Sequence, residues 1–477
     1  MPRKLWLLED PRAAAVGPTR CRTEMSSPPE TRIRWLLILW LFVLSAVAFL
    51  DRVNLSIAGA NLAEEFSISF VQLGFVFSSF LVGYALFQTP AGRLADRFGA
   101  RRILTAGVLW WGVFSALTAA IPHGIGNALA ALLAIRFLLG AGEAVMYPAA
   151  NQFVARWIPS QERGVANGII FAGVGIGAGI TPPLISYLML HWGWRSCFLI
   201  SALIGLAAGA VWFFASRDTP EAHPLVSPSE LSFIAQGIPE GASGKAAGSE
   251  MLSWPAILRS RSVWALSVSY YCFGYVAWIF FGWFFIYLAK VRGLDLKSSA
   301  PFYATLPFLA MAVASPAGGA ICDWMSRRFG ARLGRCATPV VSFIFTGIFV
   351  VLGSVAKDTR IASLVLAGGA GSLYLSQSSF WAVSADLGGK SSGSLSGFMN
   401  MAGQIGGAVT LSLTPLVAKA FGWSAGFDTA AAVALVGAVA WLFVDPHATL
   451  SPSFGRSLSA DSAERGGQAS SETREPA

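Results

Sequence analysis

The stretch Gly92-Arg93-Leu94-Ala95-Asp96-Arg97-Phe98-Gly99-Ala100-Arg101-Arg102 has a second, degenerate copy in Gly319–Gly330, which reads GAICDWMSRRFG. Each copy lies between two long apolar runs, and a second echo pairs Gly193-Trp194 with Gly422-Trp423. The two echoes have nearly the same offset along the chain. Two copies in the same orientation predict parallel repeats related by an axis along the membrane normal.

The composition indicates an integral membrane protein. The chain has 477 residues, of which 55% are hydrophobic and only 12% charged, and its mean hydropathy is +0.59. Soluble proteins carry about 25% charged residues, so most of this chain must face lipid. The net charge of +9 comes from Lys and Arg in short loops, where they set topology, and it does not indicate a nucleic-acid partner. The five cysteines have neither metal-ligand nor disulfide spacing.

Twelve apolar runs are long enough to cross a bilayer. They predict an all-α membrane protein with twelve transmembrane helices in two six-helix, pseudo-symmetric halves. The predicted regions are an N-terminal tail (1–32), a first bundle (33–216), a central loop (217–261), a second bundle (262–444) and a C-terminal tail (445–477). Both tails are expected to be disordered. In the central loop, the capping box Ser227–Glu230 predicts a short amphipathic helix.

The distribution of Lys and Arg predicts the orientation in the membrane. With the N-terminus inside, the tails and the loops on that side hold most of these residues, whereas the opposite side holds few. Positive residues concentrate on the cytoplasmic side. Both termini and the central loop are therefore expected in the cytoplasm.

Four ionisable residues interrupt the apolar runs: Asp51 and Arg52 in the first, and Arg136 and Glu143 in the fourth. A charge at the centre of a bilayer costs about 2.5–3.5 kcal/mol, so such residues mark pathways, binding sites or ion pairs. Arg136 and Glu143 share one helix face, roughly 10 Å apart along the axis. Asp51 and Arg52 point about 100° apart. Pairing between the two helices is therefore expected, either around an anion and a proton or as a structural lock.

The loop Gly92–Arg102 resembles the signature loop of the major facilitator superfamily. Leu50–Ser56, Gly140–Glu143 with Arg136, and Trp157–Arg163 further resemble the anion:cation symporters of that superfamily, which import sugar acids and other organic anions. The resemblance implies proton-coupled symport of a carboxylate by alternating access. It also implies a monomer in the bacterial inner membrane that needs no cofactor beyond the proton gradient.

The same resemblance assigns roles to individual residues. Arg52 would contact the substrate carboxylate, Asp51 and Glu143 would be the protonation sites, and Arg136 would be their ion-pair partner. Further substrate contacts would be Tyr84, Ser378, Trp381, Asn400 and Gln404. Val174 stands where several sugar-acid transporters have a glutamine, which weakens the assignment to polyhydroxy acids. The alternative for each polar residue is helix–helix packing.

The second half has no charge in mid-span, and its neutral and aromatic residues would grip the body of the substrate. These candidates include Tyr270, Trp278, Tyr374 and Gln377. In the repeated loops, Asp96 and Arg97 are expected to form ion pairs that break when the halves rock, and Asp323 would do so in the second copy. The loop residues expected to take part are Gly92, Asp96, Arg97, Gly99, Arg101, Asp323 and Arg327. Otherwise these charges only set topology.

Other functional classes fit less well. An enzyme would need a metal cluster or a nucleophile beside a base, and the four histidines lie in loops or tails without ligand spacing. A non-transporting anion sensor would need an output domain. A facilitator or exporter of the same fold, for an aromatic carboxylate or another small anion, is the main alternative.

Overall fold

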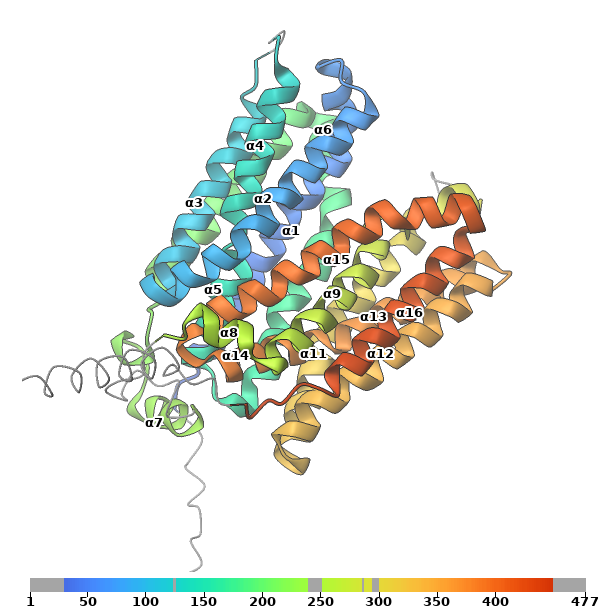
Figure 1. Ribbon diagram of the computed structural model, residues 1–477. Coiled ribbons are helices and arrows are strands. Elements are labelled where there is room, and N and C mark those ends of the chain that lie inside the picture. Colours follow the sequence, from blue (N-terminus) through green and yellow to red (C-terminus); the bar gives the residue numbers. More distant parts are fainter. Residues whose placement is uncertain (1–29, 123–125, 239–250, 285–286, 294–299, 449–477) are drawn as a thin grey trace, which may run out of the picture.

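The computed structural model describes residues 30–122, 126–238, 251–284, 287–293 and 300–448 (Figure 1). Throughout these residues the regular secondary structure is helical and no strand forms. The predicted tails lie outside the described residues except for 30–32 and 445–448.

The first half contains six membrane crossings. Its helices are α1 (Ile33–Glu65), α2 (Phe70–Phe98), α3 (Ala100–Ala119), α4 (Ala128–Glu143), α5 (Met146–Trp157) and α6 (Arg163–Ala215). Helices α4 and α5 together make the fourth crossing, with a break that precedes Pro148, a residue without an N–H for the helical ladder. Helix α6 makes the fifth and sixth crossings, because Gly193 turns the chain with φ 76° in its middle.

The second half repeats this arrangement. Its helices are α9 (Arg261–Gly282), α11 (Ala300–Phe329), α12 (Ala331–Val355), α13 (Thr359–Leu375), α14 (Gln377–Gly388), α15 (Ser392–Phe421) and α16 (Trp423–Trp441). A short π-helix, Tyr287–Val291, follows α9, and α13 with α14 makes one crossing. The helices long and apolar enough to span a membrane thus confirm the predicted all-α membrane fold.

Matching glycines in the two halves adopt the same unusual backbone conformation. Gly99 and Gly330 have φ 90° and 91°, and Gly193 and Gly422 have φ 76° and 88°. Side chains other than glycine rarely adopt such positive φ values. The repeat seen in the sequence is therefore a repeat of turn geometry that reverses the chain between successive crossings.

The central loop contains α7 (Pro228–Gly237) and α8 (Trp254–Arg259). Ser227 Oγ accepts a hydrogen bond from the Glu230 amide at 3.2 Å, as the capping box predicts. The Glu230 carboxylate instead accepts bonds from Thr31 Oγ1 (2.6 Å) and from the amides of Ile33 and Arg34. It caps the start of α1 and ties the loop to the first half.

The two halves meet at one end of the bundle, where α2 and α11 end and α15 and α6 begin; we call this the loop end. Here α2 packs against α15 and α6 against α11. Figure 1 shows the helices of the two halves converging near α5, α8 and α14 and leaning apart toward the other end. The protein is thus closed at the loop end.

The repeated aspartates hold this closure by capping helices of the other half. Asp323 also forms an ion pair with a neighbouring helix, as expected, through Arg335 of α12 at 2.7 Å. Asp96 accepts bonds from the Gly393 amide (2.9 Å), the Ser394 amide (2.7 Å) and Ser394 Oγ (2.5 Å) at the start of α15. Asp323 accepts from the amides of Gly164 (3.0 Å) and Val165 (2.7 Å) at the start of α6. Each carboxylate caps a helix N-terminus of the other half, where unpaired amides attract negative charge.

The other loop residues divide between the two halves. Arg97 is exposed, and its guanidinium lies over the Phe98 ring in place of the expected ion pair with a neighbouring helix. The Arg101 amide donates to Asp218 at the start of the central loop (2.8 Å), beside Gly99, and its Nε donates to the Phe213 carbonyl of the first half. Arg327 crosses to the first half and donates to the Gln161 carbonyl at 3.0 Å.

Candidate functional site

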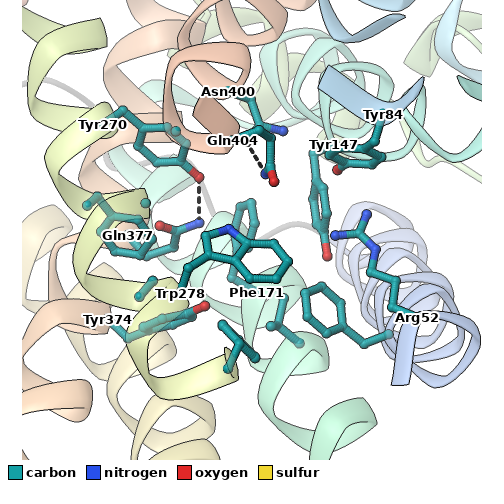
Figure 2. Close-up of a pocket in the computed structure, with 17 residues that line it drawn as sticks. Arg52, Tyr84, Tyr147, Phe171, Tyr270, Trp278, Tyr374, Gln377, Asn400 and Gln404 are labelled. Carbon is teal, nitrogen blue, oxygen red and sulfur yellow. Dashed lines mark hydrogen bonds between the residues drawn. The ribbon is translucent and has the colours of Figure 1, made fainter. Parts of the chain in front are cut away.

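A cavity lies between the halves and is lined by 17 residues from both (Figure 2). The first half contributes Phe49, Arg52, Tyr84, Tyr147, Phe171 and Val174. The second half contributes Tyr270, Phe273, Gly274, Ala277, Trp278, Phe281, Tyr374, Gln377, Asn400, Gly403 and Gln404. A site shared by both halves changes shape whenever the halves move relative to each other.

An ion pair stands at the edge of this cavity. Arg52 Nε of α1 lies 2.5 Å from Glu143 Oε1 at the end of α4, and the Glu143 side chain is only 1% exposed. The Arg52 guanidinium lies over the rings of Tyr84 and Phe49, 4.3 and 4.7 Å from their centroids. Arg52 Nη2 and Glu143 Oε2 have no hydrogen-bond partner among the described residues. The pair therefore retains capacity for a further ligand on each side.

The other two intramembrane charges lie behind the cavity and do not line it. Asp51 accepts a bond from Ser115 Oγ at 3.0 Å, and its Oδ2 has no partner among the described residues. Arg136 is buried, packs over Phe80 at 5.1 Å, and its Nε and Nη1 also lack partners there. The expected pairing between the two helices is thus made by Arg52 and Glu143. Arg136, which the resemblance implied as the partner of the acids, forms no ion pair among the described residues. Because Asp51 and Arg52 diverge on α1, only Arg52 faces the cavity.

The second half presents an amide-rich wall opposite Arg52. Gln377 Nε2 donates to Tyr270 Oη at 3.0 Å, and Gln404 Nε2 donates to Asn400 Oδ1 at 3.5 Å. Figure 2 shows Tyr270, Gln377 and Tyr374 on the side of the cavity away from Arg52, with the Trp278 indole between the two sides. Gln377 Oε1 and Gln404 Oε1 have no partner among the described residues. This wall therefore offers hydrogen bonds without charge.

Two predicted substrate contacts lie outside the lining. The Ser378 hydroxyl donates to the Ser315 carbonyl at 2.9 Å, so the packing of α14 on α11 already satisfies it. Trp381 lies one layer deeper, where its Nε1 donates to Tyr270 Oη at 3.1 Å and its ring meets Phe171 at 4.9 Å. Trp381 therefore supports cavity residues and does not line the cavity. Tyr84, Asn400 and Gln404, also predicted as substrate contacts, do line it.

Several residues that the sequence reasoning missed close the cavity toward the loop end. Gln88 Oε1 of α2 accepts a bond from Asn400 Nδ2 of α15 at 3.0 Å, and Asn151 Nδ2 of α5 donates to Ser384 Oγ of α14 at 2.9 Å. The rings of Tyr147 and Phe171 stack at 4.8 Å. Helical spacing could have found Gln88, four residues after Tyr84 on the same helix face.

Comparisons with known proteins agree with this architecture. Residues 41–411 match the family pattern described as Major Facilitator Superfamily. A probable sulfoacetate transporter of Cupriavidus necator is 32% identical over 85% of this chain and 92% of its own length. A probable galactarate/D-glucarate transporter of Bacillus subtilis is 28% identical over 82% and 87%, respectively. A chloroplastic ascorbate transporter of Arabidopsis thaliana is 30% identical over 86% and 74%.

Solved structures show the same fold at low sequence identity. A proton:xylose symporter of the superfamily superposes with a TM-score of 0.66 at 14% identity, covering 86% of this chain and 96% of that one. A second superfamily transporter, solved in an outward conformation, also gives 0.66 at 16% identity, covering 87% and 100%. These likenesses concern the fold alone. The family match and the relatives together establish that this chain belongs to the Major Facilitator Superfamily, as a multi-pass membrane transporter and not an enzyme.

Proposed function

We propose that the protein imports an organic anion together with a proton by alternating access. The observation that carries this proposal is the Arg52–Glu143 pair at 2.5 Å beside a cavity shared by both halves. The relatives named as transporters of sulfoacetate, of galactarate and glucarate, and of ascorbate support an anionic substrate.

The proposed mechanism begins with exchange of partners at Arg52. A substrate carboxylate that reaches the guanidinium competes with Glu143 for its charge and its planar hydrogen-bonding face. A buried carboxylate that loses its cation is strongly destabilised unless it takes up a proton. Substrate binding and protonation of Glu143 are thereby coupled. Asp51, with Arg136 nearby, is proposed as a second proton site behind the cavity.

The closed loop end is proposed to face the cytoplasm. The excess of Lys and Arg in the loops and tails on that side supports this orientation, with both termini inside a bacterial inner membrane. The cavity would then load from outside. Rocking of the halves would break the caps at Asp96 and Asp323 and release anion and proton inward. The protein is proposed to act as a monomer, since one chain supplies both walls of the cavity.

The test of coupling uses proteoliposomes and Glu143→Gln. Glutamine mimics the protonated acid, so the variant should bind and exchange substrate but lose accumulation driven by an inward proton gradient in sodium-free buffer. Glu221→Gln is the matched control, on an exposed carboxylate of the central loop outside the cavity, and it should accumulate substrate like the unchanged protein. Accumulation by Glu143→Gln equal to the control would remove Glu143 from the coupling step. A requirement for sodium in the unchanged protein would overturn proton coupling.

A further inference from the structure

The charges around the cavity can balance only one charged group of the substrate. This inference refines the function proposed above and rests on it. Arg52 is the single charged side chain among the 17 residues of the lining, and every lining residue from the second half is neutral. Asp51 and Arg136 lie behind the wall, and Glu143 faces Arg52. A second carboxylate at the far side would be buried without a cation, which is strongly unfavourable.

The part of the substrate beyond its charged group would lie between aromatic rings. Nine lining residues carry rings: Phe49, Tyr84, Tyr147, Phe171, Tyr270, Phe273, Trp278, Phe281 and Tyr374. Trp278 contacts Phe281 with ring centroids 5.7 Å apart, and the Tyr147–Phe171 stack lies on the first-half side. A flat, apolar body fits such walls through offset-stacked and edge-to-face contacts.

A substrate with several hydroxyl groups fits these aromatic walls poorly. Ser and Thr side chains are missing from the lining, within the part of the chain that the structure describes. Of the tyrosine hydroxyls in the lining, that of Tyr147 is bonded to Ser45 (3.0 Å) and that of Tyr270 accepts two bonds from neighbouring side chains. The Tyr84 hydroxyl has no partner among the described residues, but it lies beside Arg52 and so serves the charged end of the substrate. Each substrate hydroxyl buried without a partner weakens binding by roughly five-fold or more. Polyhydroxy acids are therefore disfavoured.

The far wall offers acceptors for one hydrogen-bond donor. The Gln377 side chain is buried, lines the cavity, and leaves Oε1 without a partner, and Gln404 Oε1 is likewise unpartnered. Figure 2 places Gln377 across the cavity from Arg52 and Gln404 beside Asn400, between the two sides. We propose that the cavity selects a monoanionic aromatic carboxylate, with its carboxylate at Arg52 and a hydroxyl or similar donor at Gln377 and Gln404. The named anions of the relatives are of other kinds, since galactarate and glucarate are polyhydroxy dicarboxylates.

The test is a matched binding series, measured by titration calorimetry on the purified protein in lipid nanodiscs. The probes are 4-hydroxybenzoate, benzoate, terephthalate, D-galactonate, D-glucarate and sulfoacetate. We expect 4-hydroxybenzoate to bind about tenfold more tightly than benzoate, because benzoate leaves the far-wall acceptors unpaired. We expect terephthalate and the sugar acids to bind at least about 30-fold more weakly than 4-hydroxybenzoate.

Variants locate the selection in the cavity. Gln377→Leu should bring the affinities for 4-hydroxybenzoate and benzoate to within about threefold of each other, because the acceptor is lost. Gln236→Leu makes the same change on the exposed face of α7, and it should keep the tenfold preference. Val174→Gln, which adds an amide to the apolar wall, should weaken binding of both aromatic acids more than Val174→Leu does.

The outcomes separate this inference from the function on which it rests. If galactonate, glucarate or sulfoacetate binds as tightly as 4-hydroxybenzoate, or no probe binds, the aromatic assignment is overturned. Proton-driven accumulation of the sugar acid would in that case leave the proposed symport intact. If 4-hydroxybenzoate binds with the expected selectivity but a proton gradient does not accumulate it, the aromatic assignment stands and the coupling fails.

Discussion

The Arg52 guanidinium has the surroundings that recognition of an anion would require. One face of its fork meets Glu143, Nη2 has no partner among the described residues, and aromatic rings surround it on the first-half side. A guanidinium binds a carboxylate through two parallel hydrogen bonds, which an ammonium group cannot reproduce. Geometry as well as charge should therefore determine affinity at this residue.

Substitution of Arg52 tests this point. Arg52→Lys keeps the charge and should weaken carboxylate binding markedly, whereas Arg52→Ala should reduce it by about 2–5 kcal/mol, the usual cost of truncating a buried charged partner. Binding of the acid and of its neutral amide to both variants would be measured by calorimetry. Arg332→Ala, on an exposed arginine, controls for the loss of a positive charge. Equal binding of acid and amide to the unchanged protein would assign Arg52 a structural role.

Residue chemistry could be predicted from the sequence more readily than residue partners. A charge in an apolar run is informative because of its insertion cost, so Arg52 and Glu143 were found. Pairing between their two helices was also predicted, and the Arg52–Glu143 contact confirms it. Which acid pairs with which arginine could not be predicted, because that depends on how α1 and α4 are rotated in the bundle. Tyr147 was also missed, although it lies four residues after Glu143, since aromatic residues in membrane spans more often pack or face lipid. Ser378, predicted as a substrate contact, lies outside the lining and donates to the Ser315 carbonyl, since a hydroxyl in a helix readily satisfies itself on a nearby carbonyl.

At the scale of elements, glycines set how closely the halves approach. A Cβ on Gly92 of α2 would lie 2.0 Å from the Gly393 carbonyl oxygen of α15, and one on Gly319 of α11 would lie 2.1 Å from the Gly164 carbonyl oxygen of α6. Both obstacles are backbone atoms, which cannot rotate away. Closure of the loop end therefore requires glycine at these crossings, as in other membrane helix pairs that pack through small residues.

Gly92→Ala should consequently destabilise the closed loop end. The expected shift is about 1–3 kcal/mol, typical of overpacking, toward the state that is open at this end. The readout is the rate at which a thiol reagent labels Ser384→Cys, a position buried against Asn151 in the closed state. Gly74→Ala on the same helix is the matched control, because nothing lies within 4 Å of its Cβ. A labelling rate no faster than that of the control would show that Gly92 does not limit closure.

The order of the membrane crossings could be predicted from the sequence, but the positions where a crossing breaks into two helices could be predicted only in part. Length and hydropathy locate the crossings, and Pro148 points to the break between α4 and α5. The corresponding break at Ser376, between α13 and α14, has no proline beside it. No local sequence pattern predicts it. That break matters because it places Gln377 at the cavity.

At the scale of the whole molecule, two junctions hold the loop end closed, and they differ in composition. The α2–α15 junction depends on Asp96 and its three hydrogen bonds. The α6–α11 junction combines the Asp323 cap with Arg335, which bonds to Asp323 (2.7 Å) and to the Ser160 carbonyl, and with an Arg163–Asp386 ion pair at 2.6 Å. The degenerate second loop copy thus carries the more heavily charged junction.

If the halves move as rigid bodies, weakening one junction must open the other. Asp96→Asn removes the negative charge from the α15 N-terminus while preserving the shape of the side chain, which should shift the equilibrium by roughly 1 kcal/mol toward opening. Spin labels on the exposed positions Gln161 and Arg328 report the distant α6–α11 junction, and the population at longer distance should grow about fivefold. Asp428→Asn, outside the loop end, provides the control for loss of a carboxylate.

If labels near Asp96 separate while the Gln161–Arg328 distance stays unchanged, the junctions open independently and rocking of rigid halves is the wrong description. A coordinated change at both junctions would mean that releasing either cap separates the two halves. The walls of the cavity belong to different halves, so they would then move apart, and the substrate would be released when the whole bundle opens.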